Sequence, residues 1–109
     1  MGFLVDIFPP KPTELRDAAA LIFGALGIRR IEQRYSDNYP GGIYLCGNTE
    51  QWEAIISKFD NQWDQEGAFN LWIHTMNEDR SPARLVEFDE MTKKVTTLLT
   101  EADWRLEKH

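Results

Sequence analysis

The sequence predicts an α+β domain: a mainly antiparallel sheet with two helices packed on one of its faces. Apolar residues alternate with polar ones over several short segments, as in half-buried strands, and recur at three- and four-residue steps over others, as in helices. Glycines and prolines that form turns separate these segments closely. With 109 residues, 42% hydrophobic and 28% charged, the chain has the size and composition of one ordered domain, residues 1–109.

The first half of the chain reads as strand, helix and hairpin. Residues 3–8 are mostly apolar and end at prolines, which predicts a strand. Thr13 is the expected N-cap of a helix with one apolar face, and Gly27 ends it. Residues 29–36 alternate in polarity, residues 43–46 are mostly apolar, and a dense turn signal separates them. These two segments therefore predict a β-hairpin.

A second helix is predicted from Asn48 or Thr49 to the residues before Gly67. Asn48 and Gln51 have the spacing of a capping box. Large apolar residues follow at helical spacing and define its buried face; they are Trp52, Ile55, Ile56, Phe59 and Trp63.

Residues 68–76 then predict a strand with two different rows of side chains. One row is Phe69, Leu71 and Ile73, and the other is Trp72, His74 and Met76. If helices cover only one side of the sheet, one row faces solvent, and an exposed Trp–His–Met row would be a binding surface. In the alternative, the C-terminal segment covers that row. Which face is exposed stays open.

The last third has two interpretations. Residues 82–107 fit the period of one long helix, which Ser81 and Pro82 would begin. We favour the other interpretation, a hairpin of strands 84–89 and 94–99, because the second of these is rich in β-branched residues. Thr100 would then cap a short C-terminal helix. The resulting order is β-α-β-β-α-β-β-β, and its first four strands and two helices match the split βαβ arrangement of ferredoxin-like folds.

The net charge of −6 lies wholly in the second half. Residues 1–49 carry five carboxylates and five lysines or arginines, whereas residues 50–109 carry thirteen and seven, together with all four tryptophans. This excess disfavours direct binding to nucleic acid and polybasic attachment to a membrane. No apolar run has the length of a membrane span. The N-terminus lacks the basic residues that begin a secretory signal. A single cysteine fits a reducing compartment. We therefore expect a cytoplasmic protein.

Carboxylates form one stripe on the predicted second helix: Glu50, Glu53, Asp60 and Asp64. Asp60 and Asp64 lie towards its C-terminal end, where the helix dipole and their mutual repulsion both disfavour them. Stability alone does not explain them, so the stripe predicts a surface for a cationic partner. The expected partner-binding residues are Glu53, Asp60, Asp64, Glu66, Trp72, Glu78 and Asp79.

No catalytic or metal-binding pattern stands out from the background. Cys46 lies in an apolar strand, which favours a buried inert thiol over a nucleophile with His74 as base. His74 and Glu78 are four apart on a strand and turn, where that spacing does not bind metal. No phosphate-binding loop follows a strand. The sequence thus predicts no enzyme, no cofactor and no metal.

The leading hypothesis is an acidic binding protein that neutralises a basic protein partner. Its most concrete form is an immunity protein that covers the phosphate-binding surface of a bacterial toxin, a nuclease in particular. One alternative is a phage-encoded mimic of nucleic acid that inhibits a host nucleic-acid-binding machine. Another is a domain that binds a small ligand, or performs minor enzymatic chemistry, on the open sheet face. The oligomeric state is left open.

Overall fold

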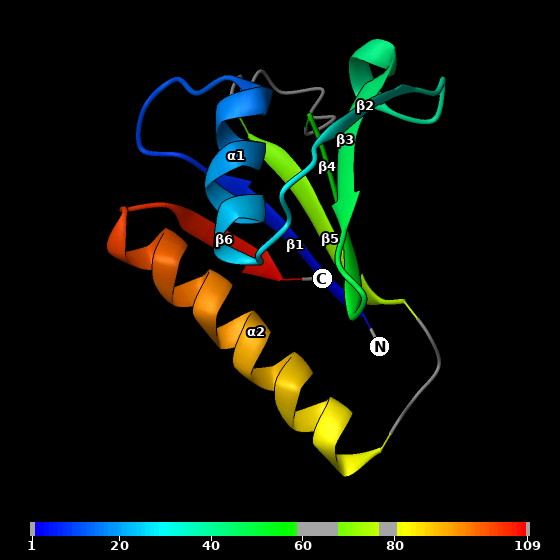
Figure 1. Ribbon diagram of the computed structural model, residues 1–109. Helices are drawn as coiled ribbons and strands as arrows, with labels where there is room; N and C mark the ends of the chain where they lie inside the picture. Colours follow the sequence, from blue (N-terminus) through cyan, green and yellow to red (C-terminus); the bar gives the residue numbers. More distant parts are fainter. Residues whose placement is uncertain (1, 59–67, 77–80, 109) are drawn as a thin grey trace.

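Side chains alternate along the strands and so give the sheet an apolar face and an opposite face. Both helices pack on the apolar face. The computed structural model describes residues 2–58, 68–76 and 81–108. Figure 1 shows helices α1 (Leu15–Ala25) and α2 (Pro82–Glu101) packed on one side of the sheet. The predicted α+β architecture, an antiparallel sheet with two helices on one face, is confirmed.

Within these residues the sheet has six strands in the order β2-β3-β4-β5-β1-β6, and every neighbouring pair is antiparallel. The predicted hairpin of the first half is formed by the pair β2–β3, with the short 3₁₀ helix η1 between them. The bounds are β1 (Gly2–Phe8), β2 (Glu32–Tyr35), η1 (Pro40–Gly42), β3 (Ile43–Asn48), β4 (Trp52–Lys58), β5 (Phe69–Thr75) and β6 (Arg105–Lys108).

One hydrophobic core lies between the sheet and the helices. The central strands contribute alternate residues to it, such as Val5 and Ile7 of β1, which are fully buried. Helix α1 adds Ile22 and Phe23 from its apolar face. Helix α2 adds residues at four-residue steps along one stripe; they are Met91, Val95 and Leu99.

The second predicted helix is wrong, because residues 52–58 form strand β4 between β3 and β5. The hydroxyl of Thr49 accepts hydrogen bonds from the amides of Gln51 (3.1 Å) and Trp52 (3.3 Å), as an N-cap would. Here those bonds close the β3–β4 turn, in which the Thr49 amide also donates to the carbonyl of Trp52 (2.9 Å). A helix cap and a turn of this kind share the same local signal.

The predicted hairpin of 84–89 and 94–99 is also wrong. Both segments belong to α2, whose N-cap Ser81 accepts from the amide of Arg84 (3.4 Å) and whose first turn contains Pro82. The favoured interpretation gave weight to β-branched residues. Burial of one helical stripe outweighs that intrinsic preference. A single helix forms, as the rival interpretation predicted, but it ends at Glu101 and does not reach residue 107.

The short C-terminal helix is replaced by a strand. Helix α2 ends where Asp103 adopts a positive φ of 65° and the Trp104 amide donates to the carbonyl of Leu99 (2.9 Å). Trp104 is buried against Phe69, with ring centroids 6.4 Å apart. The chain then enters β6, which pairs with the second half of β1.

The element order is therefore β-α-β-β-β-β-α-β. The split βαβ arrangement of ferredoxin-like folds does not form, because β1 pairs antiparallel with both of its neighbours, β5 and β6. The connection through α1 leads instead to β2, at the opposite edge of the sheet.

Candidate functional site

The sheet face opposite the helices presents a row of apolar side chains across three adjacent strands. Trp72 of β5 lies directly between Ile55 of β4 and Leu4 of β1 in the strand register. Trp72 and Leu4 are each 40% exposed, and Ile55 is half-buried. We call this surface, with its neighbours Glu53 and His74, the open face. In the described part of the chain, both helices cover the other side.

A hydrogen-bonded pair holds the next row of the open face in place. Glu53 and His74 are register partners, and a carboxylate oxygen of Glu53 lies 2.8 Å from Nε2 of His74. Nδ1 of His74 lies 3.1 Å from the carbonyl of Thr75. The imidazole thus has a hydrogen-bond partner within reach of each ring nitrogen, which fixes the orientation of the ring.

The same imidazole supports the exposed tryptophan. The rings of Trp72 and His74 are stacked, with centroids 4.5 Å apart and an interplanar angle of 30°. Glu53 fixes His74, and His74 in turn limits the rotamers of Trp72. An aromatic side chain held in this way loses little conformational entropy when a partner covers it.

The other flank of the apolar row is polar and closely packed. Asn70 donates to the carboxylate of Asp6 (3.1 Å), and Asp6 and Ser57 are both almost completely buried. Burial of a carboxylate requires hydrogen-bond partners, and Asp6 has them. This flank is therefore part of the fold, and the accessible part of the open face is the row of Leu4, Ile55 and Trp72 with its Glu53–His74 side.

Charges at the edges of this face are paired locally. At one edge Glu32 accepts from Arg34 at 2.8 Å, and this guanidinium lowers the pKa of the Glu32 carboxyl. At the other edge Arg105 pairs with Glu107, and its guanidinium also lies 4.0 Å from the ring centroid of Phe8. These two edge pairs are thus locally neutral.

The structure brings together two of the predicted partner-binding residues. Glu53 and Trp72 both lie on the open face and meet through His74, although Glu53 was expected on a helix. Alternation along residues 68–76 correctly predicted that Trp72 and His74 share a face. The C-terminal segment does not cover them, because α2 packs on the other side and β6 extends the edge.

The remaining predicted site residues lie outside the described residues: Asp60, Asp64, Glu66, Glu78 and Asp79. The sequence shows how much charge they represent. The described residues carry thirteen carboxylates and eleven lysines or arginines, so segments 59–67 and 77–80 account for four of the six net negative charges.

Sequence reasoning missed Leu4 and Ile55. Leu4 lies between Phe3 and Val5 in an almost continuous apolar run, so periodicity alone did not separate its face from theirs. Ile55 was counted in the buried face of a helix. Its adjacency to Trp72 depends on the β4–β5 register, which only the structure provides.

The thiol and the imidazole do not form a catalytic pair. Cys46 lies opposite Ile55, whereas His74 lies opposite Glu53 on the far side of β4. Cys46 is 4% exposed, and burial raises the pKa of its thiol, which disfavours the reactive thiolate. No group of three potential metal ligands occurs among the residues that the structure describes.

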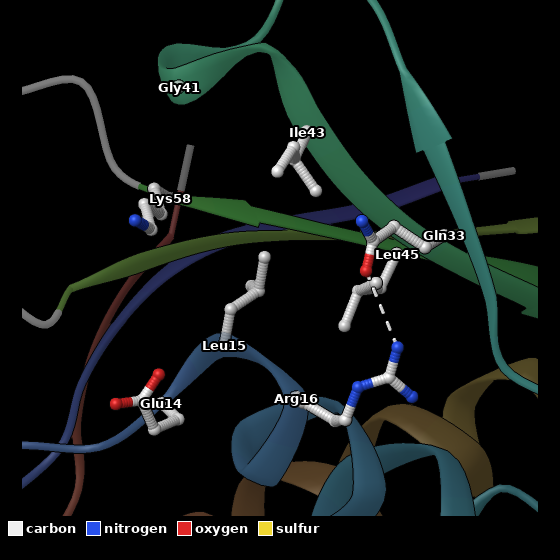
Figure 2. Close-up of a pocket in the computed structure, with 8 residues that line it drawn as sticks. All are labelled: Glu14, Leu15, Arg16, Gln33, Gly41, Ile43, Leu45 and Lys58. Carbon is white, nitrogen blue, oxygen red and sulfur yellow. Dashed lines mark hydrogen bonds between the residues drawn. The ribbon is translucent and has the colours of Figure 1, made fainter.

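A separate hollow of about 210 Å³ lies on the helix side, between the start of α1 and strands β2 and β3 (Figure 2). Its lining combines the aliphatic side chains of Leu15, Ile43 and Leu45 with polar and charged ones, which are Glu14, Arg16, Gln33 and Lys58. Figure 2 shows Arg16 reaching across to Gln33, to whose carbonyl oxygen it donates at 3.4 Å. Because Arg16 and Gln33 hydrogen-bond to each other across this hollow, we do not place the functional site there.

No family model matches this chain, and no curated protein sequence matches it. Neither helix in the described part of the chain is long and apolar enough to cross a membrane.

Proposed function

We propose that this chain is a protein-binding domain, rather than an enzyme, and that it docks a cationic protein through its open face. The observation that carries the proposal is the row of Leu4, Ile55 and Trp72, in which an exposed tryptophan is stacked on a histidine that Glu53 holds in place. Tryptophan is enriched among the residues that contribute most to binding energy at protein interfaces.

Charge supports a cationic partner. The chain has a net charge of −6, and Glu53 places a carboxylate beside the apolar row. Opposite charge on the partner would speed the encounter in a salt-sensitive way, and the apolar row would slow dissociation. Asp60, Asp64, Glu66, Glu78 and Asp79 remain proposed contributors to this negative field.

In its most concrete form, the proposal is an immunity-type inhibitor that acts in the bacterial cytoplasm on a basic toxin. A nuclease presents lysine and arginine to phosphate, and an acidic protein can occupy that surface. Inhibition of a host nucleic-acid-binding machine by a phage-encoded mimic uses the same chemistry, and only the identity of the partner separates the two.

The test begins with capture of partners on the immobilised chain at low and high salt, with identification by mass spectrometry. The dissociation constant of the identified partner is then measured for Trp72→Ala and Leu4→Ala. We expect Trp72→Ala to weaken binding by about thirtyfold, as a residue worth ~2 kcal/mol would. Circular dichroism of each variant verifies the fold.

Leu21→Ala is the matched control for Leu4→Ala, because Leu21 is 39% exposed but lies on α1, on the other side of the sheet. The proposal fails if Leu4→Ala and Leu21→Ala weaken binding equally. It also fails if the captured ligand is a small molecule or an acidic protein. A further experiment compares the affinity after charge reversal at Asp60 and Asp64 with the affinity of Glu50→Lys. A larger loss from the aspartates indicates a local acidic patch, whereas equal losses indicate a general effect of charge.

A further inference from the structure

Strand β2 forms one edge of the sheet. Within the described residues it pairs with β3 on one side and has no strand on the other. Figure 1 shows the β2–β3 hairpin at the end of the sheet opposite β6. The outward backbone amides and carbonyls of an edge strand can pair with a further strand. The side chains of β2 determine which strand fits there.

The four residues of β2 alternate between the two sides of the sheet. The register places Glu32 and Arg34 on the side of the open face, and Gln33 and Tyr35 on the helix side. On the first side, Glu32 accepts from Arg34 at 2.8 Å. On the second, Gln33 donates to the hydroxyl of Tyr35 (3.0 Å), and Tyr35 is 75% exposed. The edge thus presents both signs of charge on one side and an exposed aromatic ring on the other.

The geometry of antiparallel strands restricts how β2 could pair with β2 of a second copy. Alternate residues of β2 direct their backbone groups at β3, and the residues between them direct theirs outward. Two residues that lie directly opposite each other either both point at the partner strand or both point away from it. A two-fold axis between the copies must therefore pass through a residue. The interior residues Gln33 and Arg34 are the two candidate centres.

Charge selects Gln33 as the centre. In that register, Glu32 of each copy lies opposite Arg34 of the other, so that two pairs of opposite charge form on one side of the sheet. With Arg34 at the centre, two guanidinium groups would face each other instead. Opposite charges that face each other across antiparallel strands are stabilising, and like charges are destabilising. On the helix side, the Gln33 register places Tyr35 opposite the partly buried Ile31 of the other copy.

The other edge of the sheet, β6, suits such pairing less well. Its apolar side chain, Leu106, already packs on the core, and the strand ends at Lys108. Lysine on an edge strand opposes pairing with another chain, and β2 contains neither lysine nor proline. Residues 1–49, which include β2, carry five carboxylates and five lysines or arginines, whereas β6 belongs to the acidic half of the chain. Two copies that meet at β2 therefore avoid most of the repulsion between their acidic halves.

We propose that the protein forms a two-fold symmetric dimer in which β2 pairs antiparallel with β2 of a second copy, centred on Gln33. The two six-stranded sheets then continue into one another. Because opposed side chains point to the same side of a sheet, both open faces lie on one surface of the dimer. A four-residue strand buries little area, so we expect a weak dimer, with a dissociation constant on the order of 100 µM. The dimer does not depend on the proposed cationic partner.

Analytical ultracentrifugation of the purified chain between about 10 µM and about 1 mM measures this equilibrium. We expect the dissociation constant to rise by at least about tenfold in Glu32→Arg and in Arg34→Glu, because each change places like charges opposite each other. An equimolar mixture of the two variants should dimerise again, since the guanidinium groups of one then lie opposite the carboxylates of the other. Circular dichroism verifies that each variant is folded.

Glu107→Arg is the matched control, because it makes the same change of charge on β6 and should leave the dimer unchanged. Gln33→Cys tests the register, since residue 33 lies opposite its own copy at the two-fold axis and should form an intermolecular disulfide on oxidation. Tyr35→Cys lies on the same side of the same strand. Its two thiols would be four residues apart along the paired strands, about 13 Å, and should not cross-link. The native Cys46 is buried.

Three results would overturn the proposal. In the first, the chain stays monomeric at about 1 mM, well above the expected dissociation constant. In the second, Glu107→Arg weakens the dimer as much as Glu32→Arg does. In the third, the mixture of Glu32→Arg and Arg34→Glu stays monomeric although both variants are folded. Cross-linking through Tyr35→Cys but not through Gln33→Cys would likewise exclude the pairing centred on residue 33.

Discussion

Residue 47 illustrates how closely β3 approaches the segment that leads to β2. A Cβ atom on Gly47 would lie 2.5 Å from Cγ2 of Ile28 and 2.7 Å from the carbonyl oxygen of Arg30. A real Cβ atom essentially never lies this close to another heavy atom, and one of these two neighbours is backbone. Glycine is therefore required at this position for steric reasons, although its backbone has no unusual φ.

We predict that Gly47→Ala lowers the free energy of unfolding by about 1–3 kcal/mol, the usual cost of overpacking. Gly24→Ala is the matched control, because Gly24 is exposed on α1 and an added Cβ meets nothing within 4 Å. That change should raise stability by about 0.5–1 kcal/mol through helix propensity. Urea denaturation measures both, and equal effects would contradict the packing at Gly47.

At the scale of elements, sequence patterns predicted each element well when one periodicity dominated. The alternation in residues 68–76 and the helical spacing in α1 have no strong competitor, and both elements are present. Residues 52–58 satisfy two patterns at once. The helical pattern consists of Trp52, Ile55 and Ile56, and the buried face of a strand consists of Trp52, Ala54 and Ile56. Pairing with β3 and β5 determines that the segment forms a strand.

The candidate site shows the same limit. The pattern placed Trp72 and His74 on one face, but the pairing of Glu53 with His74 depends on the register between β4 and β5. Register is a tertiary property, set by the whole pattern of burial and by the turns. Residues of the site that belong to one strand were therefore predictable, and contacts between strands were not.

Helix α2 offers a direct test of the competition between propensity and burial. Thr97 is exposed on this helix, so Thr97→Ala removes a poor helix former without losing core contacts. We predict that stability rises by about 0.5 kcal/mol, measured by urea denaturation. In the hairpin interpretation the same change would lower stability, because threonine is favoured in strands. A decrease would therefore argue against the helix.

At the scale of the whole molecule, one core joins the sheet to both helices. Trp52 packs edge-on with Phe88 of α2, and Trp104 packs with Phe69 of β5. Both tryptophans are buried in the same cluster of side chains. Within the described residues these two regions belong to the same hydrophobic core. Loss of packing around one tryptophan should therefore also disrupt the packing around the other.

We therefore predict one cooperative unfolding transition. With 5-fluorotryptophan incorporated at all four positions, the ¹⁹F signals of Trp52 and Trp104 should lose their native intensity at the same urea concentration. Trp→Phe variants assign the signals, and the far-UV circular dichroism should change at that concentration too. Different midpoints for Trp52 and Trp104 would show that the core unfolds in separate parts.

The order of the strands in the sheet also determines when each strand finds its neighbours during synthesis on the ribosome. Strand β1 emerges about a hundred codons before its neighbour β6 is translated. Until residues 105–108 leave the exit tunnel, the backbone of residues 5–8 lacks that neighbour on one side. Unpaired edges of this kind recruit other chains. On crowded polysomes, nascent copies are therefore open to pairing with one another at this edge until β6 is available.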